Sequence, residues 1–553
     1  MKNRVRQVLG LLGAATLFTA LAIIYSWPLA LHIAHRLDRF GDPQLNAWII
    51  SWNLHAFFTP GVSLWDANIF YPHLNTLTYS ENLLFPSALM IPVRLLTDNP
   101  VLIYNIAWLA GMVLTALGAF ALARYLTHST LAGIIAGIIY ACCPFRITMA
   151  AQIQSQYTLW CPLAVLFTLI YFDQADRAMR RCFALLAGAV CLAAQFLSNM
   201  YAFMFVSVTL PLVQGIRLVS TPHRRRALIE LAAFWIVVGL LLMPVLFPYL
   251  RFREEMHFER TEREAILYSA RVASFFAWNS RNLWFGRTAT LTDNGLALSP
   301  GLIAALLAIA PFFLRRRSPT PRDWTSPTVI FAAMTFFGTV LALGPRITFF
   351  DHHVGPGPYD LLYRFVPGFD DLRVPARFVA IMMLGIAMLG AMNTRRLLAT
   401  IRSPVVRACA GCALIALVAI EYINRPNTLK YRYEPAEEYE WLKDAPPGAV
   451  LEWPIPRHEI DRWSEASRML HSTTHWKPLF NGYSGFTPPQ HAAMIDELAG
   501  WPDDRALRAI TQLKIAYVVG HKLNNAKKAE CEARMNKLAD FGRTCIFAPR
   551  PAP

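Results

Sequence analysis

Long apolar runs recur along most of this 553-residue chain, and they restrict its possible folds more than any other feature. A run of roughly 18 apolar residues or more is long enough to cross a bilayer as one helix. Charged residues make up only 16% of the chain, against roughly 25% in soluble domains. The sequence therefore predicts an α-helical polytopic membrane protein with about 11 transmembrane helices. We expect these spans near residues 8–30, 99–122, 130–148, 158–175, 183–198, 200–217, 228–250, 299–314, 326–345, 376–393 and 405–422.

Basic residues stand in short clusters between the apolar runs, and they predict the topology because cytoplasmic turns are rich in Lys and Arg. The clusters are Lys2/Arg4/Arg6, Arg124, Arg177/Arg180/Arg181, Arg217/Arg224/Arg225/Arg226, Arg315/Arg316/Arg317 and Arg395/Arg396/Arg402/Arg407. The first run lacks a small-x-small cleavage site, so we expect a retained span with a cytoplasmic amino terminus. An odd number of spans then puts the carboxy terminus outside. The net charge of +16 is spread over these clusters, which disfavours a nucleic-acid partner.

This topology sends every long polar segment to the outer face. These segments are 31–98, 251–298, 346–375 and the tail from 423. The tail alternates strand-like runs, AVLEWPIP and IAYVVG, with helical stretches. That alternation predicts a small extracytoplasmic α/β or α+β domain at 423–553, attached to a transmembrane domain at 1–422. Cys531 and Cys545 in the tail leave both a disulfide and two free thiols open.

The first outer segment carries the candidate catalytic residues, because it is rich in ionisable and aromatic side chains between Phe40 and Asn82. Asp42 and Pro43 read as a helix start, with the aspartate as the N-cap. We expect this helix to lie at the membrane interface, with Trp48 and Trp52 among the lipid headgroups. The helix dipole keeps such a carboxylate ionised, as a general base requires. From spacing alone, Asp42 would be interpreted only as a helix cap.

Glu81 is the second acid/base candidate in this segment. It precedes the apolar run LLFPSALM, where a carboxylate is costly unless it is paired or placed in a polar cleft. His73 and Tyr79 lie nearby and could contact a substrate or hold the loop by hydrogen bonds. The run Asp351-His352-His353 predicts no metal site, because three adjacent residues do not readily converge on one ion.

The order of these parts resembles the GT-C superfamily of membrane glycosyltransferases, which use polyprenyl-phosphate sugars. One span precedes a long outer loop that begins with an aspartate at a helix start, and many spans and an outer domain follow. The stretches GDPQLNAWIISW, LWDANIFYP and VPGFDDLRVPARF resemble uncharacterised bacterial membrane proteins classed with these enzymes. The tail run HWKPLFNGYSG resembles an element of the same group that would line the acceptor side.

The resemblance implies an inverting glycosyltransferase of a bacterial inner membrane, with its chemistry on the periplasmic side. Asp42 would be the general base and Glu81 the second acid, while Asn46, Trp48, His73 and Tyr79 would contact the substrates. The sequence departs from the family where Pro43 follows Asp42 in place of a second acid. No cofactor is firmly implied, and a divalent cation stays open.

A departing lipid phosphate needs cations to hold it, and three outer-face arginines could serve. These are Arg346, Arg373 and Arg377. The last two precede a span at headgroup depth, where an arginine can fork onto phosphate oxygens. The alternative is an ordinary ion pair with Asp370 or Asp371. The partners implied are a polyprenyl-phosphate-linked sugar, a glycan, lipid or protein acceptor, and membrane lipids.

Two other functions stay open. A lipid or polysaccharide transporter or assembly subunit would need ionisable residues along a path through the spans, and the central spans are nearly free of acids. A catalytically inactive GT-C-like scaffold would keep the fold without the chemistry.

Overall fold

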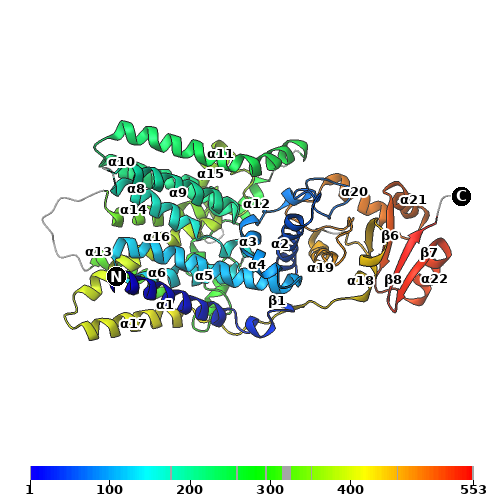
Figure 1. The fold of residues 1–553 in the computed structure, drawn as a ribbon, viewed down its shortest axis with the longest axis horizontal. Coiled ribbons are helices and arrows are strands. Elements are labelled where there is room, and N and C mark those ends of the chain that lie inside the picture. The colour runs from blue at the N-terminus through cyan, green and yellow to red at the C-terminus, as the bar shows by residue number, and fades with distance from the viewer. Residues whose placement is uncertain are drawn as a thin grey trace. The chain divides into compact units, whose positions relative to one another are not determined.

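The computed structural model describes residues 2–174, 177–256, 260–292, 295–313, 325–349, 352–457 and 459–550 (Figure 1). The chain is mostly helical and divides into two compact units. Unit 1 consists of residues 1–30, 108–247 and 257–427, and unit 2 consists of residues 31–107, 248–256 and 428–553. The first outer segment therefore folds in one unit with the carboxy-terminal tail.

Unit 1 is built from apolar helices joined by short turns and outer loops. Its helices are α1 (Lys2–Tyr25), α5 (Pro100–Thr127), α6 (Thr130–Cys142), α7 (Pro144–Thr148), α8 (Trp160–Asp173), α9 (Ala178–Phe196), α10 (Met200–Val219), α11 (Arg224–Met256), α12 (Glu262–Leu267), α13 (Leu302–Phe313), α14 (Pro327–Ala342), α15 (Tyr359–Phe365), α16 (Val379–Ala399) and α17 (Pro404–Glu421). The first residues of α5 and the last residues of α11 belong to unit 2. Strands β2 (Arg346–Phe349) and β3 (His352–Pro356) pair as an antiparallel hairpin.

The predicted fold class is confirmed. Within the described residues, nine helices are long and apolar enough to cross a membrane. Helices α13 and α14 occupy the other two predicted spans and are shorter, with 12 and 16 residues. Residues 314–324, with the expected cytoplasmic cluster Arg315/Arg316/Arg317, lie outside the described residues.

Helix α16 forms the centre of unit 1, where it contacts α6, α13 and α14. Two glycines permit this close packing. A Cβ atom on Gly338 of α14 would lie 2.5 Å from the backbone nitrogen of Met382, and one on Gly385 of α16 would collide with Thr335. Small residues let helix backbones approach where the surrounding lipid offers no hydrophobic drive for association.

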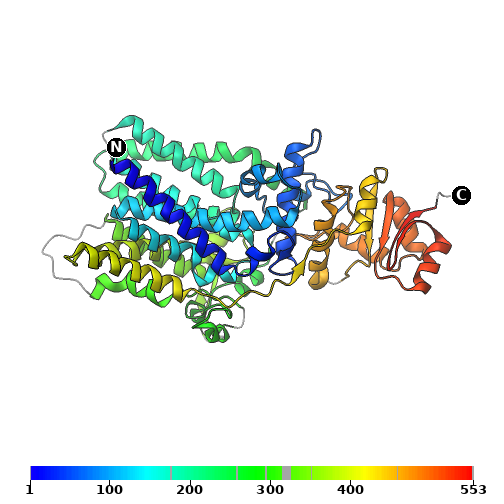
Figure 2. The ribbon, with the colours of Figure 1, turned by 60° about the horizontal axis from the view of Figure 1, so that its bottom comes forward.

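Helices α1 and α17 both pack on α6 (Figure 2). The hydroxyl of Tyr25 at the end of α1 donates a hydrogen bond to the carbonyl oxygen of Ala419 in α17, at 2.8 Å. Their remaining faces expose large apolar side chains, such as Leu9 at 62% and Val405 at 69%. Apolar faces of this kind suit contact with acyl chains.

Unit 2 contains a four-stranded sheet in the order β5-β6-β8-β7. Strands β5 (Ala449–Trp453) and β6 (Ile515–Gly520) pair in parallel, whereas β7 (Met535–Phe541) and β8 (Thr544–Pro549) complete the sheet by antiparallel pairing. The helices of the tail are α18 (Glu437–Asp444), α19 (Glu465–Ser472), α20 (Pro489–Leu498), α21 (Asp504–Gln512) and α22 (Asn525–Arg534). The tail thus has the mixed α and β composition that its sequence predicts.

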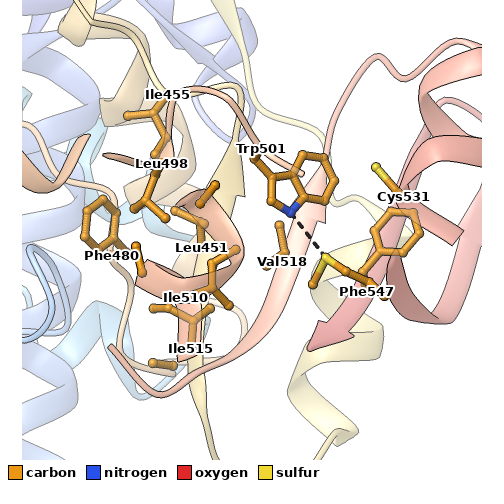
Figure 3. Close-up of a cluster of buried hydrophobic side chains, with 14 of the residues drawn as sticks. Leu451, Ile455, Phe480, Leu498, Trp501, Ile510, Ile515, Val518, Cys531 and Phe547 are labelled. Atoms are coloured by element: carbon orange, nitrogen blue, oxygen red, sulfur yellow. Dashed lines mark hydrogen bonds between the residues drawn. The ribbon is translucent and has the colours of Figure 1, made fainter. Parts of the chain in front are cut away.

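A hydrophobic cluster holds the tail together (Figure 3). Trp501 is fully buried at its centre, and its indole nitrogen donates to the sulfur of Met535 at 3.2 Å. Cys531 and Cys545 are both buried free thiols of this cluster. Of the two possibilities left open by the sequence, the structure therefore has the free thiols.

The first outer segment packs directly on the tail within unit 2. Its elements are β1 (Arg36–Leu37), α2 (Asp42–Phe58), α3 (Leu84–Leu89) and α4 (Ile91–Arg94). Strand β1 pairs antiparallel with β4 (Tyr431–Arg432). The backbone of Leu479 donates to Asn68 at 2.7 Å and accepts from Tyr71 at 3.0 Å. These backbone bonds join two stretches of chain that lie about 400 residues apart.

Candidate active site

Asp42 is the first residue of α2, but it is not the predicted N-cap. Gly41 occupies the cap with φ of 89°, and the side-chain oxygen of Gln44 accepts its backbone N–H. Asp42 is partly exposed, and its Oδ1 accepts a hydrogen bond from the hydroxyl of Tyr483 at 3.0 Å. Gly41, and not Asp42, occupies the N-cap position of α2. The carboxylate of Asp42 therefore does not cap the helix, and it contacts the tail.

The tryptophans of α2 are buried, which corrects the expectation that they lie among lipid headgroups. Trp48 is 1% exposed and donates to Oδ1 of Asn68 at 3.2 Å, and Trp52 is 4% exposed and donates to the carbonyl of Leu64 at 2.8 Å. Helix α2 packs against α19 of the tail, so the amphipathic pattern reflects packing inside unit 2. Trp48 therefore packs inside unit 2, and its role as a substrate contact stays a prediction.

The other predicted substrate contacts of this segment are also largely enclosed. Asn46 and Tyr79 are 4% and 3% exposed, and the ring of Tyr79 packs against Phe70, Phe252 and Phe486. His73 is half-buried, and burial lowers its pKa. The role of Asn46 and Tyr79 as substrate contacts stays a prediction.

Glu81 lies in the irregular segment between η2 (Thr76–Tyr79) and α3, and it is partly exposed. The next residue, Asn82, accepts a hydrogen bond from Asn53 in the second half of α2, at 2.7 Å. Asn53 follows Asp42 by about three helical turns, or roughly 16 Å along the axis. Glu81 is therefore held beside the far half of α2, away from the contact between Asp42 and Tyr483.

The predicted arginines of unit 1 have different surroundings. Arg346 begins β2, is half-exposed and forms an ion pair with Glu262 at 3.2 Å. Arg373 and Arg377 are partly buried, and within the described residues neither forms an ion pair. Arg346 therefore already has a carboxylate partner, which the other two lack.

Two tyrosines arrange the pair formed by Arg373 and Arg377. The guanidinium of Arg377 lies 4.5 Å from the ring centre of Tyr201, and that of Arg373 lies 5.5 Å from the ring centre of Tyr268. The backbone N–H of Arg373 donates to the hydroxyl of Tyr201 at 3.2 Å. The Nε atoms of both arginines are buried and have no hydrogen-bond partner in the described part of the chain. Two guanidiniums with unused donors form a suitable site for an anion such as phosphate.

In the described ranges, no group of three or more His, Cys, Asp or Glu side chains could hold a metal ion. Asp351, of the run Asp351-His352-His353, lies outside the described residues.

Sequence reasoning singled out Asp42, Arg373 and Arg377, but it missed the aromatic residues that arrange them. Tyr201 and Tyr268 carry no motif that predicts this role. Tyr483 lies in the run HWKPLFNGYSG, whose resemblance to family members was its only signal.

The fold and these residues define a polytopic membrane protein with the GT-C fold, as the sequence predicts. Across 97% of the chain, the structure resembles the arabinofuranosyltransferase AftD from mycobacteria, with a TM-score of 0.61 and 16% identity. The chain spans 41% of the length of AftD. At this identity, the likeness establishes the fold and not the reaction.

Two further glycosyltransferase structures have a weaker likeness. The oligosaccharyltransferase AglB from Archaeoglobus fulgidus gives a TM-score of 0.46 at 13% identity, over 92% of this chain and 69% of its own. ArnT from Cupriavidus metallidurans gives 0.42 at 12% identity, over 99% of this chain and 98% of its own. No family model and no curated protein matches the sequence.

Proposed function

We propose that this protein is an inverting glycosyltransferase that moves a sugar from a polyprenyl-phosphate donor to a hydroxyl of a glycan, lipid or protein acceptor. The membrane is the bacterial inner membrane, and the reaction takes place on its periplasmic face. The observation that carries the proposal is the pair Arg373 and Arg377, whose unused donors suit a lipid phosphate. The AftD-like fold supports the same reaction class.

In the proposed reaction, Asp42 accepts the proton of the acceptor hydroxyl as that oxygen attacks the anomeric carbon. The bond between this carbon and the phosphate oxygen breaks, and the polyprenyl phosphate leaves with the bonding electrons. Inversion follows because attack and departure occur on opposite faces of the sugar. Arg373 and Arg377 stabilise the negative charge that grows on the phosphate. No step is assigned to a metal ion.

The test is Asp42→Asn in the full-length protein in nanodiscs, with a panel of polyprenyl-phosphate sugars that begins with arabinofuranose, the sugar named for AftD. Removal of a general base lowers turnover by about 10²- to 10⁴-fold. The matched control is Asp98→Asn, which removes an exposed carboxylate of the same outer segment. Undiminished transfer by Asp42→Asn would refute the role of Asp42, and inactivity of the wild type with every donor would refute the donor class.

A further inference from the structure

A contact between α2 and the tail links the proposed base to a buried polar network. The hydroxyl of Tyr483 donates to Oδ1 of Asp42 at 3.0 Å. A hydroxyl that donates to a carboxylate fixes the direction of the accepting oxygen. The function of this contact depends on how firmly Tyr483 itself is held.

The backbone around Tyr483 lies between α19 and the first outer segment. Its N–H donates to the sulfur of Met469, a fully buried residue of α19, at 3.1 Å. A Cβ atom on Gly482 would lie 2.6 Å from the ring of Phe70, so the backbone there is pressed against that ring. The N–H of Phe70 in turn donates to the carbonyl of Asn481 at 3.3 Å.

Asn481 fixes this stretch with three side-chain hydrogen bonds. It is 1% exposed. Its Oδ1 accepts from the backbone N–H of Glu452 at 2.7 Å, and its Nδ2 donates to the carbonyl of Glu452 at 2.8 Å and to Oε2 of Glu465 at 2.6 Å. An amide that uses both donors and its acceptor allows only one orientation.

The two glutamates are themselves held by several partners. Glu452 accepts from the hydroxyl of Tyr439 at 2.9 Å and lies 2.7 Å from Nε2 of His521. Glu465 pairs with Arg468 at 2.6 Å. Glu452 and Glu465 are 0% and 2% exposed, so loss of a partner would leave a buried polar group with fewer hydrogen bonds. Such a network resists displacement.

We propose that Tyr483 is a positioning residue for Asp42, and that the network around Asn481 holds Tyr483 in place. The tail would thus orient the base of the first outer segment. A purely structural network would stabilise the tail without any effect on the carboxyl of Asp42. The consequence of this role for catalysis rests on the proposed function. The orientation of the Asp42 carboxyl by Tyr483 does not.

The experiment therefore measures how firmly the carboxyl of Asp42 is held, without any requirement for turnover. The full-length protein in nanodiscs is labelled with a water-soluble carbodiimide at one fixed pH, and mass spectrometry follows the labelling rate of the peptide that contains Asp42. Tyr483→Phe removes the donor, and we expect the labelling rate of Asp42 to rise by about two- to tenfold, as for the loss of one hydrogen bond. Asn481→Ser should raise this rate too, because it leaves the hydroxyl in place but releases the loop.

The matched control is Tyr517→Phe, which removes a hydroxyl bonded to the carbonyl of Pro446 in the same unit. It should leave the labelling rate of Asp42 unchanged, and thermal unfolding verifies that each variant is folded. Equal labelling rates for Tyr483→Phe and Tyr517→Phe would overturn the proposal, even if transfer activity is found. A raised labelling rate in Tyr483→Phe, in a protein that transfers no sugar, would support the positioning role and refute only the proposed function.

Discussion

Among single residues, the three arginines predicted to hold a phosphate differ in their surroundings. Arg346 has a carboxylate partner in Glu262, whereas Arg373 and Arg377 lie over tyrosine rings and have no ion pair in the described residues. A guanidinium over an aromatic face keeps its in-plane N–H groups available for a ligand. Of these three arginines, Arg373 and Arg377 therefore suit the proposed phosphate contact best.

The change of Arg373 or Arg377 to Gln should weaken binding of undecaprenyl phosphate by about tenfold or more, because each removes a charge-assisted contact. Native mass spectrometry of the detergent-solubilised protein measures this binding, with undecaprenol as the ligand that lacks the phosphate. The control is Arg364→Gln, an exposed arginine paired with Asp360. Equal affinity of all three variants for undecaprenyl phosphate would argue against a phosphate site at this pair.

His491 predicts how the stability of unit 2 depends on pH. Burial, with the charges of His73 and Arg462, lowers its pKa to about 3, whereas an unfolded histidine has a pKa of about 6.5. The unfolded state then binds more protons between these values, so stability is complete above pH 6.5 and falls as the pH falls. The loss from this residue is about 2 kcal/mol between pH 6.5 and pH 5.

His491→Asn should remove this part of the pH dependence. Hydrogen exchange of the β6 amides at pH 6.5 and pH 5, corrected for the intrinsic rate, measures the local stability. The control is His128→Asn, which replaces an exposed histidine in the turn between α5 and α6. An identical pH dependence in the wild type and in His491→Asn would contradict this account.

At the scale of elements, α2 shows how one pattern supports two arrangements. Apolar residues on a helix next to a span suit a helix that lies in the membrane interface. They suit equally a helix that packs on a neighbouring domain, and the structure has this second arrangement because α19 covers α2. Periodicity identifies the apolar face but not its partner.

The start of α2 gives a prediction of its own. Gly41 has φ of 89° and ψ of −111°, a conformation that costs a residue with a Cβ about 1–3 kcal/mol. Gly41→Ala should therefore lower stability and, because it shifts the first turn, also lower sugar transfer. Gly542→Ala, at φ of 74° with no atom within 4 Å of its Cβ, should lower stability alone. Thermal unfolding measures the loss of stability, and turnover measures the loss of sugar transfer. Equal turnover in both variants would refute an effect of the first turn of α2 on transfer.

At the scale of the whole molecule, the first outer segment and the tail share one compact unit although most of the chain lies between them. Backbone bonds, the β1–β4 pair and the stacked rings of His55 and Trp476, at 4.3 Å, join them. The buried face of α2 therefore depends on the tail for its cover. Burial of large apolar side chains contributes about 1.5–3 kcal/mol each.

A variant that ends at Asn427 tests this dependence. Without the tail, α2 loses the cover of α19, and we expect its amides to exchange at least about 100-fold faster, as in a helix that opens locally. The amides of α16, whose contacts lie in unit 1, should exchange at an unchanged rate in the same sample. Full protection of α2 in the truncated protein would show that the first outer segment folds without the tail.

Local patterns in the sequence predict the membrane class, the positions of the apolar helices, the mixed tail and the helix that starts near Asp42. These features follow from local composition and periodicity, because a helix forms its hydrogen bonds within one stretch of chain. The cap at Gly41, the burial of Trp48 and the contact of Tyr483 with Asp42 are seen only in the folded chain. Tyr483 and Asp42 lie 441 positions apart, and no local pattern encodes the partner of a buried face or of a polar side chain.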